Sequence, residues 1–280
     1  MKKVGIIGAG TMGAGIIQVF AQGGYEVAYT SRSEATREKA LALITKNLGR
    51  LVEKEKISGD ERDAALGRIS HGPDLSVVKG ACLIVETIGE DLELKKKYFA
   101  ELDEIADPDA VIASNTSAIS ISEIAGVTKR PDKIVGMHFF NPAPLMKLVE
   151  VIKGISTLDE TEAMVIEIAK EIGKTPVKVK EAPGFIVNRI LVPMINEGVS
   201  IYADGVASVE DIDEALKLGA NHVMGPLALG DLIGLDVCLS IMETLYAEFG
   251  DPKYRPHPLL RTMVRGGKLG RKAGEGFYKY

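Results

Sequence analysis

Up to about residue 180, the chain alternates between short apolar runs and longer segments whose apolar residues recur at helical spacing. Short, nearly continuous apolar runs are typical of strands buried on both faces of a sheet. Such runs predict strands at residues 4–7, 25–30, 81–85, 110–113, 134–138, 148–152 and 175–179. Helical spacing predicts helices at residues 14–22, 35–56, 92–105, 121–125 and 161–172, and a segment at 64–69 that closes a helical hairpin. This alternation predicts a mostly parallel sheet with right-handed crossovers.

The pattern changes at Pro183 and Gly184, after which the chain carries little strand signal. The apolar spacing beyond this point predicts helices at residues 186–203, 209–218, 228–249 and 259–265. We therefore expect an α/β domain over residues 1–183 and a smaller all-helical domain over residues 184–280. A length of 280 residues agrees with two domains, because single hydrophobic cores rarely grow this large.

Composition narrows the class of protein. The chain is 46% hydrophobic and 26% charged, and its net charge of −5 gives no reason to expect nucleic acid or a membrane surface as a partner. No apolar run approaches the roughly 20 residues of a membrane span. Cys82 and Cys238 lie far apart in apolar settings, which predicts reduced core thiols and no metal-ligand spacing. The chain enters a strand almost at once, leaving no room for a signal peptide. We expect a cytoplasmic protein.

A glycine-rich loop joins the first strand to the first helix. Gly8, Gly10 and Gly13 form the G-x-G-x-x-G spacing, with Thr11 and Met12 inside it. The first glycine permits a tight turn, the second lets the backbone approach a pyrophosphate, and the third lets the helix pack close to the sheet. A second strand follows at the expected distance, so the segment predicts a Rossmann-like dinucleotide-binding domain. The alternative is a glycine-rich turn that binds nothing.

The residues after the second strand bear on the identity of the dinucleotide. NAD-binding proteins usually place an acidic residue here, which accepts hydrogen bonds from the ribose 2′-hydroxyl. This chain has Ser31 followed by Arg32. An arginine can pair with a 2′-phosphate, and a serine can donate a hydrogen bond to it, so the local chemistry favours NADP. In the alternative, Arg32 pairs with Glu34 in a solvated loop and NADH binds.

Three polar residues lie next to predicted strand ends or within a strand. Ser117 and His138 each follow an apolar run, and ligands of open α/β sheets bind beyond the carboxyl ends of the strands. His138 can exchange a proton with an alcohol or a carbonyl near neutral pH, and Glu150 can orient its imidazole. The alternatives are a structural histidine and a surface carboxylate. The other three histidines have no comparable setting and are interpreted as structural: His71, His222 and His257.

Several longer motifs carry a family resemblance that covers the whole chain. They are the glycine loop, residues 113–117, the His138-Phe139-Phe140-Asn141-Pro142 box, residues 183–189, and the Gly270-Arg271-Lys272-x-Gly274-x-Gly276-Phe277-Tyr278 tail. Together they resemble the L-3-hydroxyacyl-CoA dehydrogenases, and most of all the bacterial (S)-3-hydroxybutyryl-CoA dehydrogenase group. The resemblance implies a Rossmann-like domain followed by a helical domain that forms a homodimer.

The resemblance also implies roles for single residues. His138 would be the general acid and base, with Glu150 as its partner, while Ser117 and Asn188 would hydrogen-bond the reacting oxygen of the substrate. Further positions would lie along the cofactor: Glu90, Lys95, Asn115, Asn141 and Lys272. Two positions on the basic helical hairpin would touch the CoA moiety: Asn47 and Lys54.

One position departs from the family pattern. The family usually has Asp at position 31 and uses NAD, whereas this chain has Ser31. The combined expectation is an NADP(H)-preferring enzyme, with NAD as the alternative cofactor, that interconverts acetoacetyl-CoA and similar short-chain 3-oxoacyl-CoA substrates with their 3-hydroxy forms. The alternatives are an NAD-dependent dehydrogenase acting on a free 3-hydroxyacid, and a dinucleotide-binding protein without catalysis.

Overall fold

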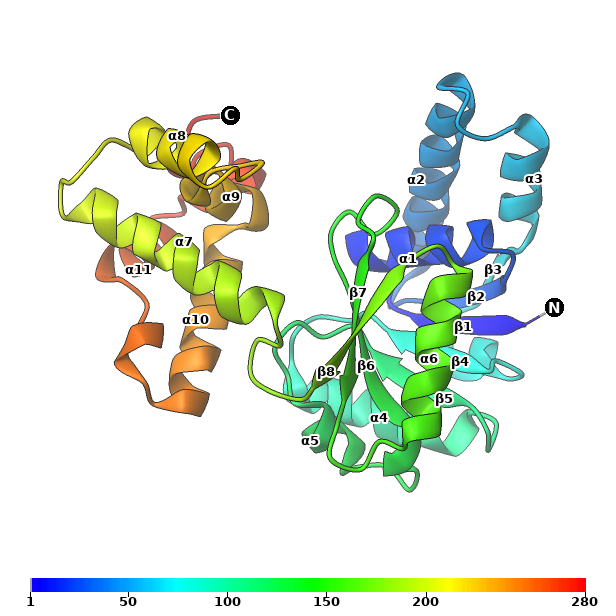
Figure 1. Ribbon diagram of the computed structural model, residues 1–280. Coiled ribbons are helices and arrows are strands. Elements are labelled where there is room, and N and C mark those ends of the chain that lie inside the picture. Colours follow the sequence, from blue (N-terminus) through cyan, green and yellow to red (C-terminus); the bar gives the residue numbers. More distant parts are fainter. Residues whose placement is uncertain (1) are drawn as a thin grey trace. The chain divides into compact units, whose positions relative to one another are not determined.

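The computed structural model describes residues 2–280 of the chain. It divides into two compact units, one ending at Glu181 and one running from Ala182 to Tyr280. The first unit contains an eight-stranded sheet, and the second is built from helices and short irregular segments (Figure 1). Each unit is described by itself below.

The sheet of the first unit has the strand order β3-β2-β1-β4-β5-β6-β7-β8. Its strands are β1 (Lys3–Ile7), β2 (Glu26–Thr30), β3 (Ile69–His71), β4 (Leu83–Glu86), β5 (Val111–Ser114), β6 (Ile134–Phe139), β7 (Leu148–Lys153) and β8 (Thr175–Lys180). Every strand pair is parallel except β6 with β7, which is antiparallel. The predicted α/β class with a mostly parallel, Rossmann-like sheet is confirmed.

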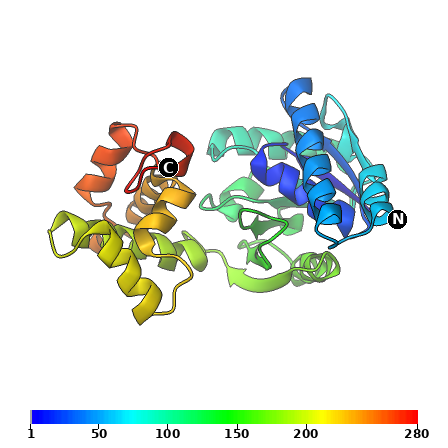
Figure 2. The ribbon, with the colours of Figure 1, turned by 90° about the horizontal axis from the view of Figure 1, so that it is seen from above.

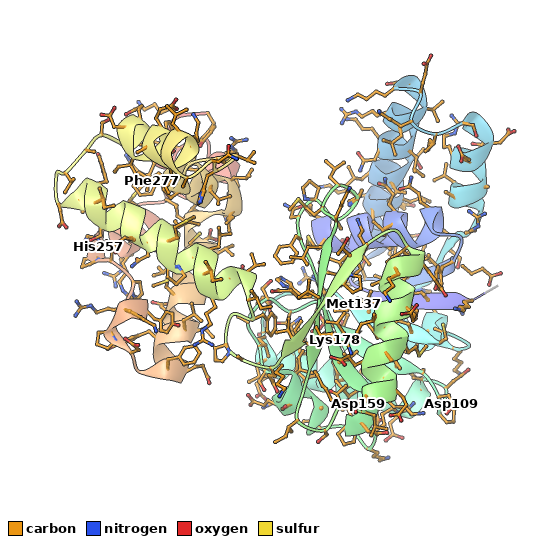
Figure 3. All side chains as sticks on the ribbon, viewed as in Figure 1. Asp109, Met137, Asp159, Lys178, His257 and Phe277 are labelled. Atoms are coloured by element: carbon orange, nitrogen blue, oxygen red, sulfur yellow. The ribbon has the colours of Figure 1, made fainter. Side chains whose placement is uncertain are left out.

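Helices cover both faces of this sheet. They are α1 (Thr11–Gln22), α2 (Glu34–Glu53), α3 (Gly59–Gly67), α4 (Leu92–Ile105), α5 (Ile121–Ala125) and α6 (Asp159–Glu171). Figures 1 and 2 show α6 on one side of the sheet and α4 on the other. Residues of α1 and α6 share one core cluster with strand residues such as Val85 and Met137. Met137, labelled in Figure 3, is completely buried in the middle of this sheet.

The helices α2 and α3 form the predicted hairpin, but its end differs from the prediction. Ser58 caps α3 through a reciprocal pair of hydrogen bonds with Glu61, which begins the helix well before residue 64. After α3, residues Ile69–His71 form the edge strand β3 instead of continuing as helix. The strand is three residues long and pairs on one side only, so it needs no apolar run and leaves no sequence signal.

The second unit is all-helical. Its helices are α7 (Val187–Ala203), α8 (Val209–Gly219), α9 (Pro226–Ile233), α10 (Leu235–Phe249) and α11 (Pro258–Arg265). The single helix predicted for residues 228–249 is wrong, because Gly234 adopts a φ of 106° and separates α9 from α10. This left-handed conformation suits glycine alone among common residues. His257, labelled in Figure 3, caps α11 by accepting a hydrogen bond from the Leu259 amide. No helix within residues 2–280 is long and apolar enough to cross a membrane.

A buried carboxylate, Asp231, fixes the C-terminal tail of this unit. It accepts hydrogen bonds from the amides of Phe277 and Tyr278 at 3.0 and 2.9 Å and from the Tyr280 hydroxyl at 3.1 Å. A side chain on Gly276 would collide with the same carboxylate. Phe277, labelled in Figure 3, packs edge-on against Tyr202. Several residues of the tail motif therefore have a structural role, because they pack around Asp231.

We predict that Asp231→Ala lowers the free energy of unfolding by roughly 2–4 kcal/mol, because it leaves three donors around a site that is 1% exposed without their acceptor. Chemical denaturation of the full-length protein measures the change. Asp204→Ala, at the exposed end of α7, is the matched control and should stay within about 0.5 kcal/mol of the starting protein. Equal effects of the two substitutions would contradict the structural role of Asp231.

Candidate active site

The glycine loop connects β1 to α1 at the carboxyl end of the sheet. Gly8 has a φ of 102°, and a side chain at Gly13 would collide with the Gly8 carbonyl and lie 2.8 Å from the Thr87 hydroxyl oxygen. A side chain on Gly10 would meet no atom within 4 Å. Thr11 and Met12 begin α1, whose first turn has no side-chain cap. Uncapped amides at the positive end of a helix suit a pyrophosphate, so this loop fits a dinucleotide.

A pocket of about 690 Å³ opens beside this loop and lies entirely within the first unit. Its size falls within the usual range for small-molecule sites. It is lined by the glycine loop, the end of β2, the start of α2, the segments after β3 and β4, and the side of α4. Its lining includes Gly8, Gly10, Ser31, Arg32, Thr36, Asp74, Thr87, Leu94 and Glu101. The structure thus brings the glycine loop and the predicted ribose-reading residues Ser31 and Arg32 to one cavity.

The turn after β2, residues 31–33, is followed in α2 by a buried basic residue that the sequence pattern did not indicate. Ser31 is half-buried and Arg32 is exposed, while Arg37, one turn into α2, is buried. The Arg37 guanidinium donates to the Ser31 carbonyl through Nη1 at 3.0 Å. The only signal in the sequence was that a second basic residue, Arg37, follows the Ser31-Arg32 pair closely. Its burial depends on tertiary packing and leaves no mark in the sequence.

Ser117, His138 and Glu150 form one continuous chain of contacts. The Ser117 Oγ lies 3.1 Å from His138 Nε2, and His138 Nδ1 lies 2.8 Å from Glu150 Oε2. His138 and Glu150 face each other directly across the antiparallel pair β6 and β7, and both are buried. Directly opposed residues of an antiparallel pair lie on one face of the sheet, which explains their contact. The ring of Phe140 packs at 4.5 Å from the imidazole.

This contact chain can move a proton. A carboxylate accepts hydrogen bonds, so the contact with Glu150 favours the tautomer of His138 that carries a proton on Nδ1. Nε2, the other ring nitrogen, faces the Ser117 hydroxyl. The structure therefore places a histidine, a carboxylate and a hydroxyl in hydrogen-bond contact at the carboxyl end of the sheet, and this combination is chemically suited to proton transfer.

Glu90 fixes the backbone around Ser117. Its carboxylate accepts hydrogen bonds from the Thr116 hydroxyl at 2.7 Å and from the Ser117 amide at 2.6 Å. Asn115, on the same turn, accepts a hydrogen bond from the Phe139 amide at 2.8 Å and so joins the ends of β5 and β6. Asn141 lies in the exposed loop that follows β6. These three predicted cofactor residues cluster near the His138 contact chain.

Lys95, a fourth predicted cofactor residue, is 1% exposed. Its ammonium donates to both carboxylate oxygens of Glu86 at 2.7 and 2.9 Å and to the Ile88 carbonyl at 3.3 Å. Glu86 also accepts from the Ser114 hydroxyl at 2.6 Å and the Ile88 amide at 2.6 Å. Burial raises the pKa of the Glu86 carboxyl, and these donors oppose that shift. An ammonium has three donors, and all three of Lys95 have acceptors within the protein.

The remaining predicted site residues lie in two other places. Asn47 and Lys54 belong to the α2–α3 hairpin, where Asn47 donates to Gln18 at 3.4 Å and Lys54 is exposed at the end of α2. Asn188 and Lys272 belong to the helical unit, where Lys272 donates to Asp236 at 2.6 Å and Asn188 lies in the first turn of α7. Residues 2–280 contain no cluster of three or more potential metal ligands.

The sheet topology, the glycine loop and the adjoining pocket define a dinucleotide-binding α/β protein. Sequence comparison matches residues 3–182 to the NAD-binding domain of 3-hydroxyacyl-CoA dehydrogenase and residues 184–280 to the C-terminal domain of the same enzyme family. The chain belongs to the 3-hydroxyacyl-CoA dehydrogenase family, as the resemblance in the sequence predicted.

Known relatives match this chain over nearly its whole length. The 3-hydroxybutyryl-CoA dehydrogenase of Clostridioides difficile is 56% identical over 99% of this chain and 99% of its own length. The probable 3-hydroxybutyryl-CoA dehydrogenase of Bacillus subtilis is 48% identical over 100% of this chain and 98% of its own. The crystal structure of (S)-3-hydroxybutyryl-CoA dehydrogenase from Ralstonia eutropha has a TM-score of 0.97 and 49% identity, covering 100% of this chain and 99% of that one.

We predict that Gly10→Ala weakens dinucleotide binding by at least about tenfold and leaves the thermal stability of the protein unchanged. The added methyl group would meet no protein atom within 4 Å, but it would occupy space that the loop keeps for a pyrophosphate. Isothermal titration calorimetry and thermal unfolding measure the two effects. Gly219→Ala, at the end of α8 and equally free of neighbours, is the matched control and should leave binding unchanged. Unaltered affinity in Gly10→Ala would contradict the assignment of the loop.

Proposed function

We propose that this protein interconverts acetoacetyl-CoA and (S)-3-hydroxybutyryl-CoA, together with similar short-chain substrates, and that it prefers NADP(H) to NAD(H). The observation that carries the reaction is the contact chain Ser117–His138–Glu150 at the carboxyl end of the sheet that also bears the glycine loop. The substrate rests on relatives of 56% and 48% identity whose names specify 3-hydroxybutyryl-CoA.

Residues of the first unit fit the cofactor. Gly8, Gly10 and Gly13 with the first amides of α1 would hold the pyrophosphate, and Ser31 and Arg32 would meet the adenosine ribose. When bound, the nicotinamide supplies the hydride for reduction or accepts it in oxidation. Glu90, Asn115 and Asn141 lie on the turns next to His138, where they would orient the reacting end of the site.

The protein's own residues move the proton. In the reducing direction, His138 donates its Nε2 proton to the oxygen on C3 of the 3-oxoacyl group as C3 gains a hydride, which yields the hydroxyl. In the oxidising direction, His138 removes that proton. Glu150 stabilises the imidazolium, while Ser117 donates a hydrogen bond to the same oxygen as negative charge develops there. We assign Asn188 a second hydrogen bond to this oxygen.

The preference for NADP(H) rests on the ribose-reading turn. Ser31 stands where an acidic residue would accept the 2′-hydroxyl hydrogen bonds of NAD, and Arg32 is exposed beside it at the same pocket. A guanidinium pairs with a phosphate through two parallel hydrogen bonds, whereas an aspartate in place of Ser31 would repel it.

The proposal also covers the CoA contacts, the oligomeric state and the cellular location of the protein. Asn47 and Lys54 on the α2–α3 hairpin would contact the CoA moiety. The helical unit exposes large apolar side chains, including Val206, Leu218 and Val223, and we propose that it forms a homodimer through such surfaces. Neither cysteine forms a disulfide, which supports a reducing, cytoplasmic location.

We predict a higher kcat/KM for acetoacetyl-CoA reduction with NADPH than with NADH. Steady-state rates at matched concentrations of the two cofactors give this ratio directly. A higher value with NADH would overturn the cofactor preference and leave the reaction standing. Turnover of the free 3-oxoacid without turnover of the thioester would replace the proposed substrate. Cofactor binding without turnover of any 3-oxoacyl-CoA would overturn the enzymatic function.

We predict that His138→Gln lowers kcat by about a hundred- to ten-thousand-fold, because the amide cannot donate and recover a proton. Dinucleotide affinity should stay nearly unchanged, since the glycine loop that would hold the pyrophosphate joins β1 to α1 and does not include His138. Stopped-flow or steady-state absorbance measures the rate, and calorimetry measures the affinity. His222→Gln, in the helical unit, is the control and should keep its rate. Substantial turnover by His138→Gln would remove His138 from the proton-transfer step.

A further inference from the structure

Arg37 is a buried cation at the ribose-reading turn. It is 8% exposed, and its Nη1 donates to the Ser31 carbonyl at 3.0 Å. Its Nε is buried and has no hydrogen-bond partner. Throughout residues 2–280, no carboxylate lies within 4.0 Å of the Arg37 guanidinium, so the structure gives this charge no counter-ion.

Burial of the Arg37 guanidinium without a counter-ion costs free energy. A guanidinium carries five donors, remains charged at all relevant pH values, and loses hydration when it is buried. Another partly buried arginine of the same unit, Arg130, has an ion pair. Its Nε pairs with the buried carboxylate of Asp103 at 2.7 Å, and its other nitrogens donate to the carbonyls of Asp103 and Asp107 at 2.7 and 2.6 Å. Arg37 has one carbonyl acceptor where Arg130 has an ion pair and several carbonyls.

The position of Arg37 connects it to the dinucleotide pocket. Ser31, whose carbonyl it holds, lines the pocket together with Arg32 and Thr36, the residue that precedes Arg37. The Ser33 side chain caps α2, so the positive end of this twenty-residue helix lies at the same turn. Two arginines and a helix N-terminus therefore lie beside the place expected for the ribose, with one exposed carboxylate, Glu34, in the first turn of the same helix.

Negative groups of the pocket lie on other segments. Asp74 and Glu101 also line it. The Asp74 carboxylate accepts a hydrogen bond from the Ser76 amide at 2.8 Å and caps the short helical turn that follows. Glu101 is exposed on α4 and lies 4.0 Å from Lys97. Neither carboxylate pairs with Arg37, so neither cancels its charge at short range.

We propose that Arg37 is a positioning and specificity-determining residue for a 2′-phosphorylated adenosine, acting behind Ser31 and Arg32. It holds the Ser31 carbonyl, which orients the Ser31 hydroxyl and the Arg32 side chain around the phosphate. Its own charge, which has no counter-ion in the protein, adds to the attraction. The inference rests on the proposed preference for NADP(H) and adds a residue to it.

Binding of nucleotide fragments to the full-length protein tests this role. The probes are adenosine 2′,5′-bisphosphate, which carries the 2′-phosphate, and 5′-AMP, which lacks it. We expect Arg37→Gln to weaken binding of the bisphosphate by at least about tenfold, which corresponds to about 1.4 kcal/mol, and to leave 5′-AMP affinity unchanged. In the same variant, the KM for NADPH should rise while the KM for NADH and both kcat values stay near their starting values.

Two further variants control for folding and for the loss of any arginine. Arg37→Met removes the hydrogen-bond donors as well as the charge, and we expect unfolding of the unliganded protein to need equal or higher denaturant concentration, since a well-packed apolar side chain replaces a buried cation without a counter-ion. Either Arg37 variant can decide the test if the other does not fold. Arg68→Met is the matched control, because Arg68 is half-buried, donates to one backbone carbonyl, Ala21, and does not line the pocket.

The outcomes separate the two proposals. If the unaltered protein binds both fragments equally and prefers NADH, the NADP(H) preference and the role of Arg37 are both wrong. If it prefers the bisphosphate but the Arg37 variants weaken both fragments equally, or neither, Arg37 has no specificity role and the NADP(H) preference stands. A loss confined to the bisphosphate, absent in Arg68→Met, supports both.

Discussion

The candidate site depends on one buried ion pair, Lys95 with Glu86. Glu86 ends β4, and its carboxylate binds the ammonium on α4, the Ser114 hydroxyl at the end of β5 and an amide of its own turn. Both side chains are almost completely buried, so each charge is tolerated only because the other is present. The pair fixes the ends of β4 and β5 relative to α4. These strand ends carry the turns on which Thr87, Asn115 and Ser117 lie.

The second constraint is the reversal of direction between β6 and β7. The antiparallel register opposes Glu150 and His138 directly and brings Nδ1 to 2.8 Å from the carboxylate. Burial strengthens this contact, because few water molecules compete for the imidazole. The single antiparallel step found among the described strands thus supplies the orienting group of the histidine, while the parallel part supplies the glycine loop.

Local sequence predicted the features that local geometry determines. The glycine spacing predicted the loop, and apolar runs predicted seven of the eight strands, because both signals lie within a few residues. The edge strand β3 and the break at Gly234 were missed, since a short edge strand needs no apolar run and one glycine does not interrupt a helical pattern. Contacts between distant residues, such as Glu86 with Ser114, follow from the strand order, and no spacing along the chain announces them.

The sequence pattern could not single out Arg37, because the pairing of buried charges depends on contacts between residues far apart in the chain. In the first unit, the buried acids Glu86, Asp103 and Glu150 each contact a basic side chain that the fold itself supplies. Arg37 is equally buried and receives one carbonyl. Within the first unit, Arg37 is thus a buried cation without a counter-ion, and it lies next to residues that line the ligand pocket. An anionic group on the ligand would complement this cation, which is the physical basis of the proposed preference for a 2′-phosphorylated cofactor.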